Sequence, residues 1–198
     1  MDQRDSDARD AGLEEVALRS ESVFEGHFLR IWRDTVRLPD GAQAQREYIR
    51  HSGAVMVVPL LDDGRVLMER QWRTPMRRVM IEFPAGKLDA GESWQACAQR
   101  ELREETGYRA REWAYIGTIN NAISYSDEVI HLAFARGLDA GAQQLDAHEF
   151  LELIEVDCDE LMDWVRGGRV TDVKTVIGAF WLDKVRRGDW PLDWQSLD

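Results

Sequence analysis

A short run of acidic side chains carries the clearest chemical potential in the sequence. Glu101, Glu104 and Glu105 are spaced i, i+3 and i+4, so on a helix all three carboxylates share one face. Arg100 can offset only part of their mutual repulsion. A Glu-rich run by itself is most simply a solvated helix face. The alternative is a site for a hard cation, because Mg²⁺ takes carboxylate oxygens and leaves other positions for water and substrate phosphates.

The spacing of the residues around this run separates the two interpretations. The segment from Gly86 to Tyr108 resembles the Nudix box, the signature of a family of Mg²⁺-dependent hydrolases that cleave a nucleoside diphosphate linked to another group. The residues that fill its specified positions are Gly86, Glu92, Arg100, Glu101, Leu102, Glu104, Glu105, Gly107 and Tyr108. Since every specified position is filled, we interpret the run as a metal site.

The resemblance implies a magnesium site on the box helix, with Mn²⁺ as a possible substitute. The ligands that it implies are Glu101 and Glu105, Glu104 in an assisting role, and the backbone carbonyl of Ala85. Glu92 and Arg100 belong to the same motif, and their opposite charges suit them to hold the box loop against the helix.

Within the family, the sequence is similar to the ADP-ribose pyrophosphatases from about Val23 to Arg187. The segments 69–73 and 82–92 resemble that branch's strand before the box and its entry into the box. The branch implies hydrolysis of ADP-ribose to AMP and ribose 5-phosphate. One departure leaves another substrate open: residues 120–128 lack the proline usual in the branch, so GDP-mannose or another nucleoside diphosphate sugar is the alternative.

The general base in this branch is a glutamate outside the box, on a loop before a late strand. The matching residue here is Glu149, and Glu152 is the second candidate. Gly141, Ala142 and the polar stretch 143–148 give the preceding loop a composition that allows movement. A mobile loop can deliver a base once metal and substrate are bound.

Several side chains outside the box are candidates for substrate contacts. Bidentate arginine contacts to phosphate or ribose, stacking on adenine and polar contacts to the sugar are the roles considered. The candidates are Arg73, Arg46, Glu47, Trp32 and Glu128. Each also has a plainer explanation, because arginines are often solvated and tryptophans usually fill a core or an interface.

Two turn signals indicate strands in the first half of the chain. Pro39-Asp40-Gly41 and Asp62-Asp63-Gly64 each lie between two runs rich in β-branched and aromatic residues. The first predicts a hairpin with room for a third strand. The second predicts two strands joined by a tight turn.

The remaining pattern predicts the fold class and the domains. Ser93 as N-cap and Gly107 as the terminating glycine bound one helix, with strands after it and two helices at the end. This order favours an α+β fold, a Nudix α/β/α sandwich with a mixed sheet. We assign residues 1–20 to a tail, 21–52 to an N-terminal β segment and 53–198 to the Nudix domain. By resemblance, the β segment exchanges between subunits of a homodimer and helps to form the substrate pocket.

Composition limits the possible partners. The 198 residues include 37 Asp or Glu against 25 Lys or Arg, and the net charge of −12 disfavours nucleic acid and anionic membranes. Cys97 and Cys158 lack the spacing of a zinc site, and no signal peptide or membrane span is apparent. We therefore expect a cytoplasmic enzyme acting on a small nucleoside diphosphate sugar. A non-catalytic ADP-ribose sensor is the rival, but such modules commonly lose box carboxylates that this sequence keeps.

Overall fold

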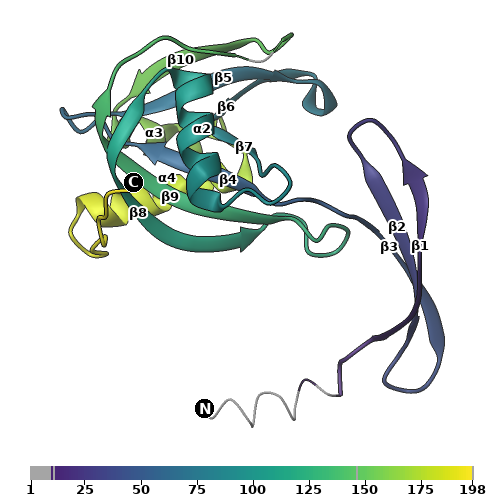
Figure 1. Ribbon diagram of the computed structural model, residues 1–198. Helices are drawn as coiled ribbons and strands as arrows, with labels where there is room; N and C mark the ends of the chain where they lie inside the picture. Colours follow the sequence, from purple (N-terminus) through teal and green to yellow (C-terminus); the bar gives the residue numbers. More distant parts are fainter. Residues whose placement is uncertain (1–9, 11, 146, 198) are drawn as a thin grey trace. The chain divides into compact units, whose positions relative to one another are not determined.

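The structure is a computed structural model that describes Asp10, residues 12–145 and residues 147–197. The chain divides into two units, one comprising Met1–His51 with Ala122–Glu128 and the other Ser52–Asn121 with Val129–Asp198. Among the described residues, the smaller unit contains one antiparallel sheet and the larger contains the three longer helices (Figure 1). No described helix is long and apolar enough to cross a membrane.

The N-terminal unit is a three-stranded antiparallel sheet. Its strands follow the order β1-β2-β3 and are β1 (Val16–Glu25), β2 (Arg30–Arg37) and β3 (Gln43–Ile49). The predicted turn joins β2 to β3, where Gly41 has φ 87° and the side chain of Asp40 accepts from the backbone N–H of Ala42 at 2.9 Å. The third strand allowed for in this segment is therefore present.

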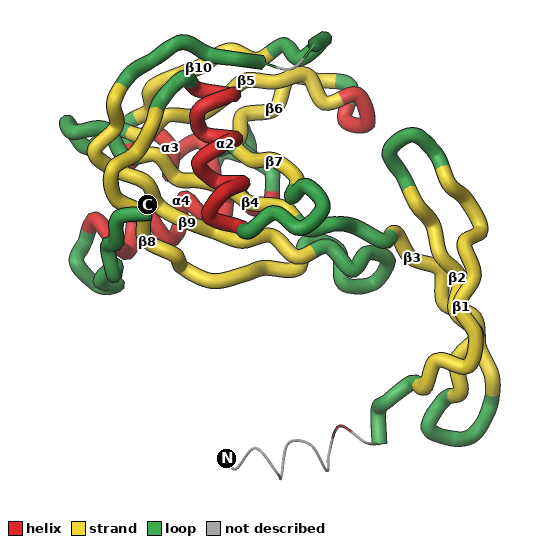
Figure 2. The backbone as a smooth tube through the Cα atoms, viewed as in Figure 1, coloured by secondary structure: helices red, strands yellow, loops and turns green. Residues whose placement is uncertain are grey.

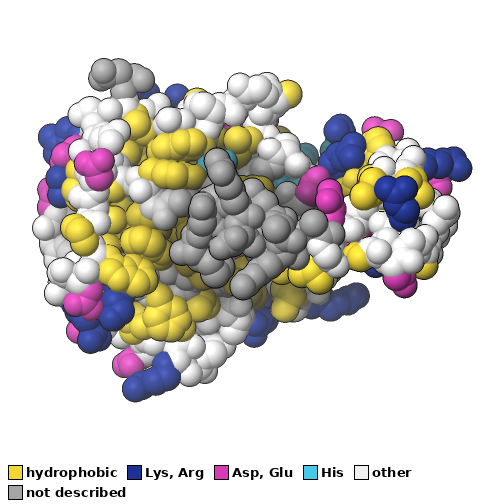
Figure 3. Space-filling view, turned by 90° about the horizontal axis from the view of Figure 1, so that it is seen from below, with side chains coloured by type: hydrophobic (Ala, Val, Ile, Leu, Met, Phe, Trp, Pro, Cys, Tyr) yellow, Lys and Arg dark blue, Asp and Glu magenta, His cyan; other side chains and the backbone are white. Residues whose placement is uncertain are grey.

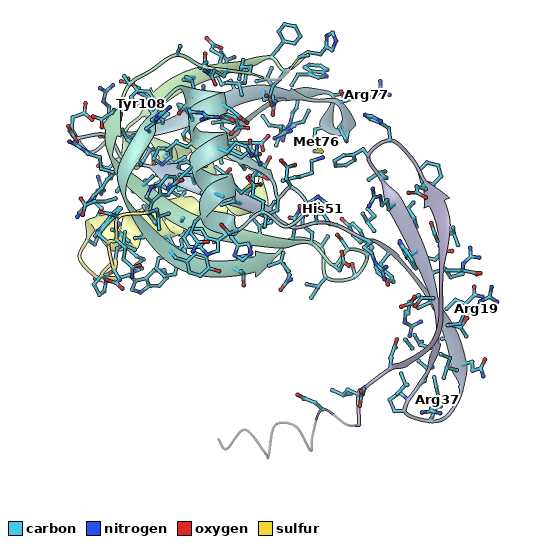
Figure 4. All side chains as sticks on the ribbon, viewed as in Figure 1. Arg19, Arg37, His51, Met76, Arg77 and Tyr108 are labelled. Carbon is cyan, nitrogen blue, oxygen red and sulfur yellow. The ribbon has the colours of Figure 1, made fainter. Side chains whose placement is uncertain are left out.

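Strand β1 begins inside the segment that the sequence assigned to a tail. Val16–Ser20 pairs with β2 in this structure. The local sequence is polar and did not predict a strand here, but pairing with β2 satisfies the backbone hydrogen-bonding groups of this segment. Residues 1–9 and 11, which make up most of the predicted tail, lie outside the described residues. Arg19 lies on β1 and Arg37 at the end of β2 (Figure 4).

The larger unit contains two sheets. The four-stranded sheet has the order β7-β4-β9-β8 and is mixed, because β4 pairs in parallel with β9 and all other pairs are antiparallel. Its strands are β4 (Ala54–Pro59), β7 (Ala85–Lys87), β8 (Arg109–Asn120) and β9 (Val129–Asp139). The three-stranded sheet has the order β10-β5-β6, with β5 (Val66–Arg73), β6 (Arg78–Glu82) and β10 (Leu151–Val156).

The two strands predicted on either side of Asp62-Asp63-Gly64 are confirmed, and so is the turn that joins them. The turn at Gly64 is present, with φ 89° and a hydrogen bond from the Leu61 N–H to the Arg65 carbonyl of 2.9 Å. The strands on either side nevertheless belong to different sheets, apart from a single bridge between Leu60 and Val66. The reason is that β4 already has a partner on each edge, so β5 turns away to pair with β6 and β10.

Three longer helices in the described part of the chain cover the sheets of the larger unit. They are α2 (Trp94–Thr106), α3 (Cys158–Arg166) and α4 (Val173–Arg186), and their N-caps are Ser93, Asp157 and Asp172. The predicted ends of α2 are confirmed: Ser93 accepts from the Ala96 N–H, and Gly107 closes the helix with φ 77°. Figure 2 shows this helix lying against the strands of the larger unit.

Successive side chains of β4 point to opposite faces of its sheet, and this alternation explains the layered architecture. Met56 and Val58 face a core shared with α3 and α4, whereas Val55 and Val57 face a second core shared with α2. A strand buried on both faces reads as a continuous apolar run, as Ala54–Pro59 does. The predicted α+β sandwich with a mixed sheet and a separate small antiparallel sheet is confirmed.

Candidate active site

The entry to α2 is built around the close approach of Gly86 and Glu101. A Cβ atom at Gly86 would lie 1.8 Å from Oε1 of Glu101, so any other residue would collide with that carboxylate. The first glycine of the box is therefore required by space. It lets β7 place backbone directly against an acidic side chain of the helix.

Arg100 ties the box loop to the helix. Its guanidinium donates to both carboxylate oxygens of Glu92, at 3.0 and 2.9 Å, and to the carbonyl of Lys87 at 3.0 Å. The same group reaches Glu101 at 2.7 Å and Glu104 at 3.3 Å. The hydrogen bond from Arg100 lowers the pKa of Glu92 to about 2. The structure thus brings together the two residues expected to fasten this loop.

Glu105 and Glu69 form a buried acidic pair beneath this network. Oε2 of Glu105 accepts from the Ala85 N–H at 2.9 Å, so Ala85 is adjacent to the carboxylates as expected. Burial, and then the charges of Glu69, Glu101 and Glu149, raise the pKa of Glu105 well above its usual value. Burial likewise raises the pKa of Glu69 to about 8. Oε1 of Glu69 is buried with no hydrogen-bond partner among the described residues.

Glu149 lies close enough to this cluster for its charge to matter. It raises the pKa values of Glu69, Glu101 and Glu105, although burial is the largest cause in each case. Gln71 on β5 donates to Oε1 of Glu149 at 3.3 Å. The first-choice base predicted from the sequence therefore lies beside the acidic cluster.

The loop that carries Glu149 is partly anchored. Gln143 donates through its side chain to the carbonyl of Glu105 at 2.6 Å, and the Gln144 N–H donates to the carbonyl of Glu104 at 2.9 Å. His148, just before Glu149, has φ 73°, an uncommon backbone conformation for a residue other than glycine. The first part of the loop is thus fixed to α2, which narrows the region where the predicted movement can occur.

The second-choice base occupies a different environment. Glu152 on β10 forms an ion pair with Arg70 on the neighbouring strand β5, and its side chain is 65% exposed. The ion pair holds the Glu152 carboxylate against Arg70 at the protein surface. The geometry favours Glu149 over Glu152.

The donor set suits a divalent cation. Glu69, Glu101 and Glu105 are acidic groups held in a largely buried space, and Arg100 contacts only Glu101 of these three. A hard cation with oxygen ligands would relieve the repulsion among these carboxylates and would give the unpaired oxygen of Glu69 a partner. Among the described residues, no three acidic, His or Cys side chains are already arranged to hold a metal ion. Glu101 instead bonds to Arg100, and Glu105 to the Ala85 N–H.

Arg73, a predicted phosphate ligand, is held at the end of β5 by Glu82. Its guanidinium donates to both oxygens of Glu82 at 2.7 and 3.0 Å. Lys174 on α4 donates to Glu82 at 2.6 Å and to Asp172 at 2.9 Å. Burial by itself would raise the pKa of Glu82, but the two cations lower it to about 2. The Arg73 side chain as a whole is 43% exposed.

Two further substrate candidates lie in the N-terminal unit with aromatic or imidazole neighbours. The guanidinium of Arg50 stacks over the Trp32 ring, 3.8 Å from its centroid, and so covers one face of the indole. The face of Trp32 opposite Arg50 is the one left to stack on a base. The second candidate is Glu128, whose Oε1 lies 3.6 Å from Nδ1 of His51.

The remaining two candidates form ion pairs within the same unit. Arg46 binds Glu15 through two hydrogen bonds of 2.9 and 2.6 Å. Glu47 accepts two from Arg33, at 2.9 and 2.7 Å. Exposed pairs of this kind are weak, so a substrate can displace them.

Sequence reasoning missed Glu69, Glu82 and Lys174 as site residues. Glu69 directly follows the buried run Val66–Met68, and Glu82 follows the buried Met80 and Ile81. The sequence signal for such residues is an acidic side chain at the end of an apolar strand. Burying a charge there is unfavourable unless it is paired with an opposite charge or binds a ligand.

Fold and site together define a class: an acidic loop-helix-loop motif on an α/β/α sandwich. Residues 50–173 match the model of the NUDIX domain, and residues 15–49 match that of the nucleoside diphosphate sugar hydrolase N-terminal domain. The chain therefore belongs to the Nudix family.

Similar proteins cover most of the chain. A methanol dehydrogenase activator from Bacillus methanolicus is 37% identical, over 86% of this chain and 93% of that protein. ADP-ribose pyrophosphatases from Bacillus subtilis and Mycobacterium tuberculosis are 36% and 32% identical. The alignments cover 86% and 91% of this chain, and 93% and 90% of theirs. A crystal structure of an ADP compounds hydrolase shares the fold, with a TM-score of 0.80 at 23% identity, covering 88% of this chain and 95% of that one.

Proposed function

We propose that this protein hydrolyses the diphosphate of ADP-ribose to give AMP and ribose 5-phosphate. The observation that carries the proposal is the buried acidic cluster of Glu69, Glu101 and Glu105 against the backbone of Ala85 and Gly86. Two relatives of similar length are named ADP-ribose pyrophosphatase, which supports this substrate.

The cation in this proposal is Mg²⁺, with Mn²⁺ as the alternative. The residues that would hold it are Glu101 and Glu105, Glu104 in support, and the Ala85 carbonyl. When bound, the cation neutralises diphosphate charge and lowers the pKa of an attacking water. Arg100 keeps Glu101 and Glu104 on the side of the helix that faces the box loop.

Glu149 is the proposed general base. It takes a proton from the water whose oxygen forms a new bond to phosphorus, while the bond from that phosphorus to the bridging oxygen breaks. The leaving group is a phosphate monoester, and the proton stays on the carboxylate until release. Gln71 orients the acceptor through its hydrogen bond to Oε1 of Glu149.

Arg73 is the proposed phosphate ligand of the larger unit. A guanidinium with an exposed edge can offer parallel N–H donors to phosphate oxygens. Glu82 keeps Lys174 as a partner when Arg73 shifts toward the substrate, so the buried carboxylate is never left without a cation.

A homodimer is part of the proposal. The three strands of the N-terminal sheet contain one fully buried apolar residue, Val36, and leave Leu18 and Phe24 among the exposed ones. Hydrophobic side chains are visible on the surface of this unit (Figure 3). Small sheets need a covered apolar face to be stable, and a second subunit would provide it.

The alternative substrate is another nucleoside diphosphate sugar, such as GDP-mannose. The description of the family model matched by residues 15–49 favours that wider class. Purified protein should be assayed with Mg²⁺ against ADP-ribose, GDP-mannose and other nucleoside diphosphate sugars, with Glu101→Gln as the inactive control. The highest kcat/KM for ADP-ribose supports the proposal; preference for another sugar nucleotide replaces the substrate but keeps the chemistry.

A non-catalytic ADP-ribose sensor is the rival from another class. Binding of ADP-ribose without turnover of any compound in the same panel would establish it. The complete set of box carboxylates and the buried cluster around Glu105 favour the enzyme.

A further inference from the structure

A pocket lies on the flank of α2, where the helix meets strand β8. Its volume is about 380 Å³, within the range of sites for small molecules. The described residues that line it are Ala96, Gln99, Arg100, Arg103, Arg109, Ala110 and Trp113. None of the acidic cluster residues Glu69, Glu101 and Glu105 is in this lining.

The lining is positively charged although the protein is acidic. Three of the described lining residues are arginines and none is Asp or Glu, in a chain of net charge −12. Arg100 is engaged by the box carboxylates, and Arg103 contacts Glu104 at 3.3 Å. Arg109 on β8 adds an exposed guanidinium. A pocket with this lining selects against cations and in favour of anions.

Two unpaired donors belong to residues of the same lining. The indole Nε1 of Trp113 and Nε of Arg103 are buried and have no hydrogen-bond partner within the part of the chain that the structure describes. Trp113 is 2% exposed, so water does not reach its indole N–H freely. Buried N–H groups are almost always paired, so two unpaired donors in residues that line one pocket favour an acceptor at that place.

We propose that this pocket binds the phosphate or carboxylate group of a small molecule, at a site separate from the acidic cluster. Because both N–H groups are buried in the structure, the side chains of Trp113 and Arg103 shift on binding so that the oxyanion accepts from them, and Arg109 contributes charge at the mouth. Ala96 and Ala110 leave room for an apolar part of the ligand. The site is one side chain away from Glu101, because Arg100 borders both the pocket and the acidic cluster.

The test is an NMR titration of the full-length protein without divalent cations. The probe is inorganic phosphate, with acetate in a parallel titration, and the signal is the indole N–H resonance of Trp113. We expect a saturable shift with an apparent Kd of about 1 mM or tighter for at least one probe. The probe that binds identifies the group, phosphate or carboxylate.

Matched variants locate the binding. Arg103→Gln should weaken binding by about tenfold, because it removes a charged donor. Arg111→Gln removes the same charge from strand β8, outside the lining, and should leave the affinity unchanged. Trp113→Phe should lose the shifted resonance and weaken binding measured by calorimetry. If this core variant does not fold, the exposed Arg109→Gln serves with Arg103→Gln.

The outcomes decide the proposal. A Trp113 resonance that does not respond to either probe overturns it. Binding that is equally strong in Arg103→Gln and in wild type also overturns it, because the anion would then occupy another cationic surface. Loss of enzymatic turnover is not a readout, so the result does not depend on the proposed hydrolase activity.

Discussion

Glu69 on β5 and Glu82 on β6 lie directly opposite each other in the antiparallel register, and both are buried, at 3% and 4% exposure. Like charges in this position destabilise a strand pair. Glu82 is balanced by Arg73 and Lys174, whereas Oε1 of Glu69 has no partner among the described residues. The pKa values of the two carboxylates therefore shift in opposite directions: burial raises that of Glu69 to about 8, and the paired cations lower that of Glu82 to about 2.

The first prediction tests the proposed metal ligands. Glu101→Gln and Glu105→Gln should each reduce turnover by about 100-fold or more while the fold remains intact, because an amide keeps the shape but loses the charge that binds a cation. Steady-state kinetics and circular dichroism provide the measurements. Glu112→Gln, the same change in an exposed pair with Arg136, should have no effect. Normal turnover in both box variants at saturating Mg²⁺ would contradict the metal site.

Removal of the cation provides the second prediction. Mg²⁺ should raise the melting temperature and EDTA should reverse the rise, with about 2.7 kcal/mol of stabilisation at a concentration 100 times Kd. Because the pKa of Glu69 is raised to about 8 and that of Glu105 is also raised, binding releases protons and should tighten as pH increases toward that value. Calorimetry in buffers of different ionisation enthalpy measures the released protons. A pH-independent affinity with no proton release would argue against these carboxylates as the site.

The third prediction concerns the general base. Glu149→Gln should lower kcat by roughly 100-fold or more, the scale of general-base catalysis, with little change in KM or Mg²⁺ affinity. Glu152→Gln is the matched control and should remain close to wild type, because Glu152 is paired with Arg70 at the surface. The reverse ranking would move the base to Glu152. Equal and full activity of both variants would place the base inside the box.

Acid sensitivity of folding is the fourth prediction. The pKa of Glu82 is lowered to about 2 from 4.5, so its pairing stabilises the fold fully above the unfolded value and is lost as pH falls from 4.5 toward 2. Glu82→Gln should cost about 3–5 kcal/mol at neutral pH, because it leaves Arg73 and Lys174 without their shared partner. The variant should also lose less stability than wild type across that acid range. Thermal unfolding at a series of pH values measures both effects.

An exposed carboxylate controls for the general effect of charge removal. Glu155→Gln, which breaks a surface pair with Arg65, should change stability by no more than about 1 kcal/mol. A Glu82→Gln variant as mild as this control would show that the buried pair contributes little.

The fifth prediction concerns assembly. Light scattering should give a dimer at micromolar concentration, and Phe24→Asp should shift it toward monomer by placing a charge on the apolar face of the N-terminal sheet. Phe180→Asp is a matched control on α4, since Phe24 and Phe180 are 52% and 51% exposed. A wild-type monomer, or equal dissociation by both variants, would count against an interface at the N-terminal sheet.

The sequence by itself determined the parts of this protein that depend on local spacing. Ser93 and Gly107 set the ends of α2, and the helical period placed Glu101 and Glu105 on one face. These features were predictable because a cap, a terminating glycine and an i, i+4 pair act within a few residues of each other.

Tertiary structure alone decided which distant groups meet that helix. Strand register set Glu69 against Glu82, and the packing of α4 brought Lys174 to the same carboxylate. The separation of β4 and β5 into different sheets likewise depended on a partner of β4 that is distant in the sequence, strand β9, as in the pairing of Ala54 with Ile130. A strand's period of two residues fixes which side a residue faces but not what lies opposite. That depends on register and packing, which no local pattern encodes.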